Sequence, residues 1–188
     1  MISPMVSDDQ LLEEARKGDN AAFQQIVERY ESLVAGTVVG MLGNTQEAED
    51  VAQEVFIRFY KSMQQFRGDS ALGTYLTRIA INLSLNALKK QKRKNLFSLF
   101  SSNQKHPELS IPDTGINQDQ KETQAMVQRA LLELEEEFRS VIVLRMIDGY
   151  STKETAKILE LPLGTVLSRL SRAQKKLKEV LTQSYGFT

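Results

Sequence analysis

Apolar residues recur every three or four positions along most of the chain, and no stretch alternates apolar with polar residues between turn signals. Such spacing lines apolar side chains along one face of a helix. The clearest example follows Ala21, where the apolar positions are Phe23, Ile26, Val27, Tyr30, Leu33, Val34 and Val38. The pattern predicts an all-α protein.

Capping residues and helix breakers divide the first half of this pattern into four helices. The first begins at Ser7, where Gln10 stands at the spacing of a capping box. A second runs from about Ala21 to the glycines near position 43, and we expect Asn44 to cap the third. A fourth covers roughly residues 70–92. Together these helices predict a compact bundle.

The segment 95–120 differs in composition, because Ser, Asn, Gln, Asp, Pro and Gly dominate it. This composition predicts a flexible linker between two small helical domains, at 7–94 and 121–184. The second domain opens with an apolar stripe from about Lys121, which we expect to form one helix ended by Gly149.

A helix-turn-helix is indicated near the C-terminus. Ser151 and Glu154 form a capping-box pair that opens a short helix, and the run 161–164, Leu-Pro-Leu-Gly, cannot continue it. A new helix begins around Thr165, and residues 164–178 contain five basic residues and no acid. In this layout the second helix lies in the major groove of DNA. The alternative is a helical hairpin whose charged face is solvated.

Charge is distributed unevenly along a chain whose formal net charge is zero. From Arg58 to Lys94 there are nine basic residues against the single acid Asp69, and the 164–178 segment is the second basic block. Two separate basic surfaces suggest two contacts with a polyanion, and the acid-rich stretches suggest a protein partner. The loop 66–74, with Phe66 and Tyr75 at its ends, fits single-stranded DNA, which binds by stacking and phosphate neutralisation. Core packing is the alternative for both rings.

Composition excludes several kinds of site. The chain has no cysteine, so disulfides and thiolate zinc sites are excluded and a reducing compartment, the cytoplasm, is expected. No apolar run approaches the ~18 residues that span a bilayer, so we expect no membrane contact. Glu47, Asp50 and Glu54 share a helix face as metal-binding carboxylates would, but the only histidine, His106, lies in the linker. We therefore expect no metal.

Three motifs resemble the extracytoplasmic-function sigma factors of bacterial RNA polymerase. The run 47–56, EAEDVAQEVF, resembles the region 2 helix that grips the polymerase clamp. The runs 66–70, FRGDS, and 74–83, TYLTRIAINL, resemble the segment that melts and reads the minus-ten promoter element. The run 162–173, PLGTVLSRLSRA, resembles the region 4 recognition helix for the minus-thirty-five element. The resemblance covers about residues 11–181.

This resemblance implies region 2 at 7–94, region 4 at 121–184, and no catalytic residue or cofactor, because the polymerase performs the chemistry. The implied contacts with core RNA polymerase in region 2 are Asp50, Gln53, Glu54, Ile57 and Tyr60. The implied minus-ten DNA contacts are Phe66, Arg67, Ser70, Thr74, Tyr75, Arg78, Asn82, Lys89 and Lys90. The implied minus-thirty-five DNA contacts are Thr165, Leu167, Ser168, Arg169, Ser171, Arg172, Lys175 and Lys176.

The implied partners are the clamp and flap elements of core polymerase, promoter DNA as duplex and as melted strand, and an anti-sigma protein. Asn82 and the loop would hold an extruded base, while Arg78 and the lysines would follow the phosphates. Tyr75 stands where the family usually has Trp, and basic residues common at the positions of Leu167 and Gln174 are missing. These departures leave the base preference open.

Alternatives from other classes remain at this point. A stand-alone helix-turn-helix regulator would bind duplex DNA without polymerase, but would leave the 58–94 basic block without a role. A helical metal-dependent hydrolase could use the Glu47, Asp50 and Glu54 face. Arg169 could pair with an acid such as Glu154 instead of reaching DNA.

Overall fold

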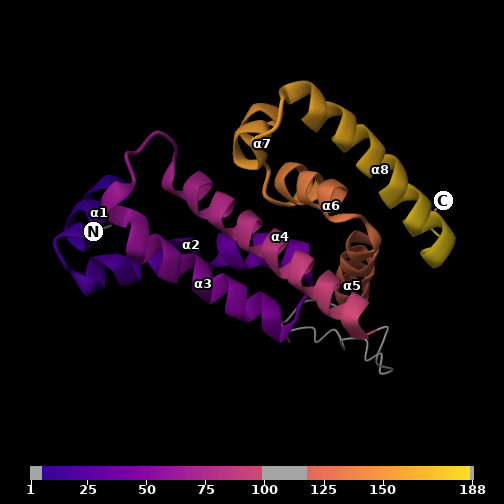
Figure 1. Ribbon diagram of the computed structural model, residues 1–188, viewed down its shortest axis with the longest axis horizontal. Coiled ribbons are helices and arrows are strands. Elements are labelled where there is room, and N and C mark those ends of the chain that lie inside the picture. The colour runs from indigo at the N-terminus through magenta and orange to yellow at the C-terminus, as the bar shows by residue number, and fades with distance from the viewer. Residues whose placement is uncertain (1–5, 99–117, 187–188) are drawn as a thin grey trace.

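The computed structural model describes residues 6–98 and 118–186. Within those two ranges every regular element is helical, which confirms the all-α prediction. The N-terminal bundle contains α1 to α4, and the C-terminal domain contains α5 to α8 (Figure 1).

The first three helices begin at polar caps. Helix α1 (Asp8–Arg16) opens with the predicted capping box of Ser7 and Gln10, and Asp19 caps α2 (Asn20–Leu42). Helix α3 (Gln46–Ser62) is capped by the Thr45 hydroxyl, which accepts from the Ala48 amide at 3.2 Å. The expectation that Asn44 would cap α3 was wrong by one residue, because the extended backbone of a cap falls at Thr45.

After the 3₁₀ turn η1 (Met63–Gln65), helix α4 (Leu72–Ser98) runs six residues beyond the predicted end. Apolar stripes of the four helices meet in one core. Its fully enclosed side chains include Ile26, Val34, Val38, Met41, Val55, Phe59, Leu76 and Ile81. The central residues of the predicted linker, 99–117, lie outside the described residues.

The helix expected from Lys121 to Gly149 is broken into α5 (Gln118–Glu133), α6 (Glu136–Ile142) and the π-helical turn η2 (Val143–Ile147). Arg139 explains the break. Its guanidinium donates to the carbonyl of Leu132, in the last turn of α5, at 2.6 Å and to that of Leu134, just after the helix, at 2.8 Å. A side chain that satisfies the carbonyls of the preceding helix end permits the chain to turn there.

Helices α7 (Thr152–Leu159) and α8 (Leu163–Tyr185) form the predicted helix-turn-helix. Ser151 and Glu154 make the capping box reciprocally, at 3.2 and 2.8 Å. Glu160 adopts a left-handed conformation with φ of 54° and so ends α7.

The C-terminal domain packs directly on the N-terminal bundle, mainly against α2 and α4. Val143, Leu144 and Ile158 belong to the same apolar cluster as the bundle core. At Gly40 the α2 backbone approaches so closely that an added Cβ would lie 2.9 Å from Val143 Cγ2. In Figure 1, α4 runs between α3 and the helices of the C-terminal domain.

Candidate polymerase and DNA interfaces

Helix α3 presents an exposed stripe that combines acids with apolar side chains. Asp50 and Gln53 are exposed, and Glu54 forms an ion pair with Arg58 at 3.0 Å. Ile57 and Tyr60 are each 47% exposed although both are large and apolar. The spacing of the five predicted residues brings them onto one side of the helix. Exposed apolar side chains beside carboxylates are suited to a protein partner.

The loop between α3 and α4 is anchored at its base and exposed at its tip. Arg67, Gly68 and Asp69 are exposed, while Phe66, Ser70 and Thr74 are partly buried. The Phe66 and Tyr75 rings lie 4.8 Å apart by their centroids. An exposed tip that carries an arginine, on a fixed base, is suited to an unpaired strand.

Tyr75 serves the bundle core more than the surface. Its ring also meets Phe59 edge-on at 6.1 Å, and its hydroxyl lies 3.2 Å from that of Ser62. These contacts favour the core-packing alternative for Tyr75, and they position Phe66 at the loop entry.

The predicted DNA contacts of α4 fall into two groups. Asn82, Lys89 and Lys90 are exposed along the helix. Arg78 is partly buried against the C-terminal domain, where Nη2 donates to the Lys157 carbonyl at 3.2 Å and Nε has no partner. Beside it, the hydroxyls of Thr77 and Tyr150 lie 2.8 Å apart. The C-terminal domain therefore covers part of the predicted DNA-binding side of α4.

Helix α8 buries Val166 and Ala173 and turns a basic face outward. The exposed members of the predicted set are Leu167, Ser168, Ser171, Arg172 and Lys175. Their spacing places them on one side of the helix. Leu167, 52% exposed, offers an apolar contact, and Arg172 and Lys175 offer charge.

The two other basic residues of the α8 set have partners inside the domain. Arg169 pairs with Glu137 at 2.8 Å, so it does find an acid, although on α6 and not Glu154. Lys176 pairs with Glu135 at 2.9 Å and lies 4.7 Å over the Phe138 ring. Thr165 is partly buried at the start of the helix.

Residues at the junction between the domains were missed in the sequence. Arg139, only 6% exposed, also donates to the Met41 carbonyl at the end of α2, and burial lowers its pKa. Gln128 donates to the Val39 carbonyl at 2.6 Å. The signal was an arginine inside an apolar stripe, beside Phe138 and Val141, where a solvated side chain would be out of place.

The carboxylates that suggested a metal site do not converge. Within the described parts of the chain there is no group of three His, Cys, Asp or Glu residues that could hold a metal ion. The same residues include no helix long and apolar enough to cross a bilayer.

Comparisons with known proteins identify the family. Residues 26–94 match the family Sigma-70 region 2, and residues 124–177 match Sigma-70, region 4. The chain is 36% identical to the ECF RNA polymerase sigma-E factor of Escherichia coli K12, over 94% of this chain and 95% of that one. The chain belongs to the ECF sigma factors. It is also 35% identical to the RNA polymerase sigma-H factor of Pseudomonas aeruginosa, over 93% of both chains.

Solved structures share the fold of this ECF sigma factor. The sigma factor RpoE of Bartonella quintana, solved with the anti-sigma factor NepR, aligns with a TM-score of 0.68 at 22% identity. That alignment covers 86% of this chain and 97% of the other. CnrH, solved with the cytosolic domain of CnrY, aligns with a TM-score of 0.63 at 25% identity, over 91% and 94% of the two chains.

As an ECF sigma factor the protein is an initiation subunit and not an enzyme. It binds core RNA polymerase and directs it to promoters. Membership of this family rules out both the hydrolase and the stand-alone regulator. The roles of single residues stay predictions.

Proposed function

We propose that the exposed stripe of α3 binds core polymerase, that the α3–α4 loop and α4 open and read the minus-ten element, and that α8 reads the minus-thirty-five element. The observation that carries the proposal is the pair Ile57 and Tyr60. Two large apolar side chains are about half exposed beside Asp50 and Glu54, although one edge of the Tyr60 ring contacts Phe23 of α2 at 5.0 Å between centroids. When a partner covers such side chains, the loss of water-exposed apolar surface stabilises the complex.

For the minus-ten element, the proposed energy source is contact with bases that have left the stack. Unstacking costs a few kcal/mol per base, and stacking on protein groups plus phosphate neutralisation by Lys89 and Lys90 repays it. For the minus-thirty-five element, the exposed face of α8 fits the major groove, with Arg172 and Lys175 nearest the DNA. Arg169 and Lys176 contribute less, because they already have carboxylate partners.

We infer that the arrangement described here, in which the C-terminal domain packs against α4, is the closed form that the free protein adopts. Arg78 and Thr77 are engaged by the C-terminal domain, so the two domains must separate before α4 can take up DNA along its whole length. A protein that stabilised the closed form would inhibit, and the anti-sigma factor bound to the RpoE of Bartonella quintana is the kind of partner expected. We propose that the protein acts in the cytoplasm, where the polymerase is found. A chain without cysteine is consistent with that reducing compartment.

The test is run-off transcription with purified core polymerase and a promoter library. Ile57→Asp is expected to weaken core binding, with Glu31→Ala, an exposed acid on α2, as its control. Arg172→Ala is expected to leave core binding intact and reduce promoter use, with Arg129→Ala, exposed on α5, as its control. Normal core affinity in Ile57→Asp, or normal promoter selection in Arg172→Ala, would contradict the corresponding assignment.

A further inference from the structure

The end of α1 is tied to the entry of the α3–α4 loop by a single arginine. Arg16 Nε donates to the Met63 carbonyl at 2.8 Å, and its Nη2 donates to the Phe66 carbonyl. In return, the Gln64 side-chain amide donates to the Arg16 carbonyl at 2.8 Å. These three bonds join segments about fifty residues apart in sequence, where η1 ends and the exposed loop begins.

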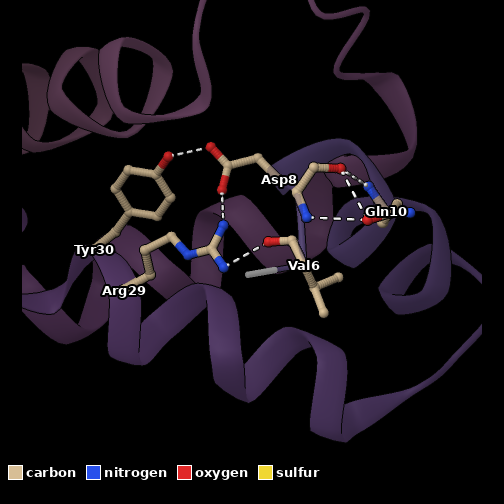
Figure 2. Close-up of polar contacts among 6 residues, drawn as sticks. Val6, Asp8, Gln10, Arg29 and Tyr30 are labelled. Atoms are coloured by element: carbon tan, nitrogen blue, oxygen red, sulfur yellow. Dashed lines mark hydrogen bonds and ion pairs between the residues drawn. The ribbon is translucent and has the colours of Figure 1, made fainter. Parts of the chain in front are cut away.

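Helix α1 is in turn held to α2, as Figure 2 shows. Arg29 pairs with Asp8 and also donates to the Val6 carbonyl at 2.8 Å, and the Tyr30 hydroxyl donates to the Asp8 carboxylate. Burial and this carboxylate raise the pKa of Tyr30 to about 12. Leu11, Leu12 and Ala15 form the buried face of α1. Arg16 therefore extends from a fixed support.

The same support reaches the far end of the loop. A Cβ added to Gly73 would lie 3.0 Å from Tyr30 Cε1, so the Tyr30 ring closely contacts the first turn of α4. Arg16 contacts the loop where it leaves η1, and Tyr30 contacts it where it enters α4. The α1–α2 pair thus brackets the segment 66–73.

The geometry at Phe66 explains why this matters. Phe66 is extended, with φ of −67° and ψ of 116°, and its ψ sets the direction in which Arg67 leaves. A guanidinium that binds two carbonyls in a fork fixes both peptide planes, whereas a lysine ammonium acts as a point charge without that geometry. Without Arg16, the Phe66 carbonyl would be free to turn, and the loop tip would turn with it.

We propose that Arg16 is a positioning residue for promoter opening, which holds the α3–α4 loop in the shape that receives an unstacked base. Arg16 itself does not touch DNA in this proposal. The inference rests on the proposed role of that loop in the minus-ten interaction.

The test compares holoenzymes that carry the wild-type chain, Arg16→Ala, Arg16→Lys or Gln64→Ala. Each is titrated with single-stranded minus-ten oligonucleotides and with versions abasic at one position. The wild type is expected to prefer the base over the abasic site by about tenfold at the captured position, the size expected for one stacked base. Arg16→Ala is expected to lower this ratio toward one, Arg16→Lys to restore part of it, and Gln64→Ala to lower it less.

Lys17→Ala is the matched control, because Lys17 is the next residue and its ion pairs with Glu13 and Glu14 are exposed. It should keep the wild-type ratio, and all variants should keep wild-type core affinity and duplex minus-thirty-five binding. A wild-type ratio in Arg16→Ala would overturn the inference. So would an equal loss of core affinity, which would mean that Arg16 only stabilises the fold. No preference in the wild type would overturn the proposed role of the loop itself, a result visible without any variant.

Discussion

Asp148→Asn is expected to stabilise the protein at neutral pH and to have a progressively smaller effect as the pH falls toward 3.8. Asp148 lies at the junction of the two domains, with Oδ2 3.0 Å from the Thr37 hydroxyl. That hydroxyl is also 3.0 Å from the Leu33 carbonyl. The Thr37 hydroxyl donates to this carboxyl oxygen, but its single proton is shared between Asp148 Oδ2 and the Leu33 carbonyl. Burial therefore raises the pKa of Asp148 more than this shared donor lowers it.

Burial raises the pKa of Asp148 from 3.8 to about 6. The folded protein then holds a proton that the unfolded chain releases, so this group stabilises the fold in weak acid. The stabilisation is complete below 3.8, the pKa of the unfolded carboxyl, and is lost as the pH rises from there through about 6. A rise in pKa from 3.8 to about 6 corresponds to about 3 kcal/mol of lost stability, and partial exposure to solvent reduces this to about 1–2 kcal/mol. Asparagine keeps an oxygen that accepts from Thr37 and has no charge to bury.

The measurement is denaturant unfolding of both proteins across a series of pH values. The free energy of unfolding of Asp148→Asn should exceed the wild type by about 1–2 kcal/mol near pH 7.5, and the gap should shrink to about a third of that near pH 4.5. Asp69→Asn, at an exposed loop acid, is the control and should run parallel to the wild type. Parallel curves for Asp148→Asn would refute the reasoning, as would a variant less stable than wild type at neutral pH.

Two further changes test how the domains are joined. Gly40→Leu should separate the two domains, because even a Cβ at this position would lie 2.9 Å from Val143. Small-angle scattering should then show a larger radius of gyration. Gly36→Leu is the control and should not change this radius, because Gly36 lies on the same helix with open space around it. A compact Gly40→Leu protein would contradict the observed contact. Arg139→Met should lower the free energy of unfolding by about 3 kcal/mol in denaturant titration, since it removes two buried hydrogen bonds and one partly buried one to backbone carbonyls. A loss below about 1 kcal/mol would show that water replaces the guanidinium.

Signals confined to a few neighbouring residues could be predicted well. The capping boxes at Ser7 and Ser151 depend on residues three apart, and both form as expected. The exposed α3 stripe and the outward face of α8 follow from helical spacing alone. The Asn44 cap was wrong because Asn44 and Thr45 are both good caps, and the choice between them depends on backbone angles that the sequence does not state.

Features that depend on distant residues could not be predicted in this way. The break after α5 depends on the reach of Arg139 to carbonyls, and its third bond goes to Met41, ninety-eight residues away. The partners of Arg169 and Arg78 are likewise set by how helices pack and not by local pattern. The tie between Arg16 and Phe66 belongs to the same class, since each residue is unremarkable within its own segment.

The π-helical turn η2 holds one residue more than an α-helical turn, and the contact between the two domains depends on that additional residue. Its wide turn is closed by the Asp148 amide, which donates to the Val143 carbonyl at 2.9 Å, five residues back. An α-helix advances by about 100° per residue, so the additional residue in this turn rotates everything after it by about that angle. Asp148 and Tyr150 thereby face α2 and α4. Deleting one residue from η2 would turn Asp148 and Tyr150 away from α2 and α4. It would also shift α8 on α6, where Ala173 shares a core with Phe138 and Ile142.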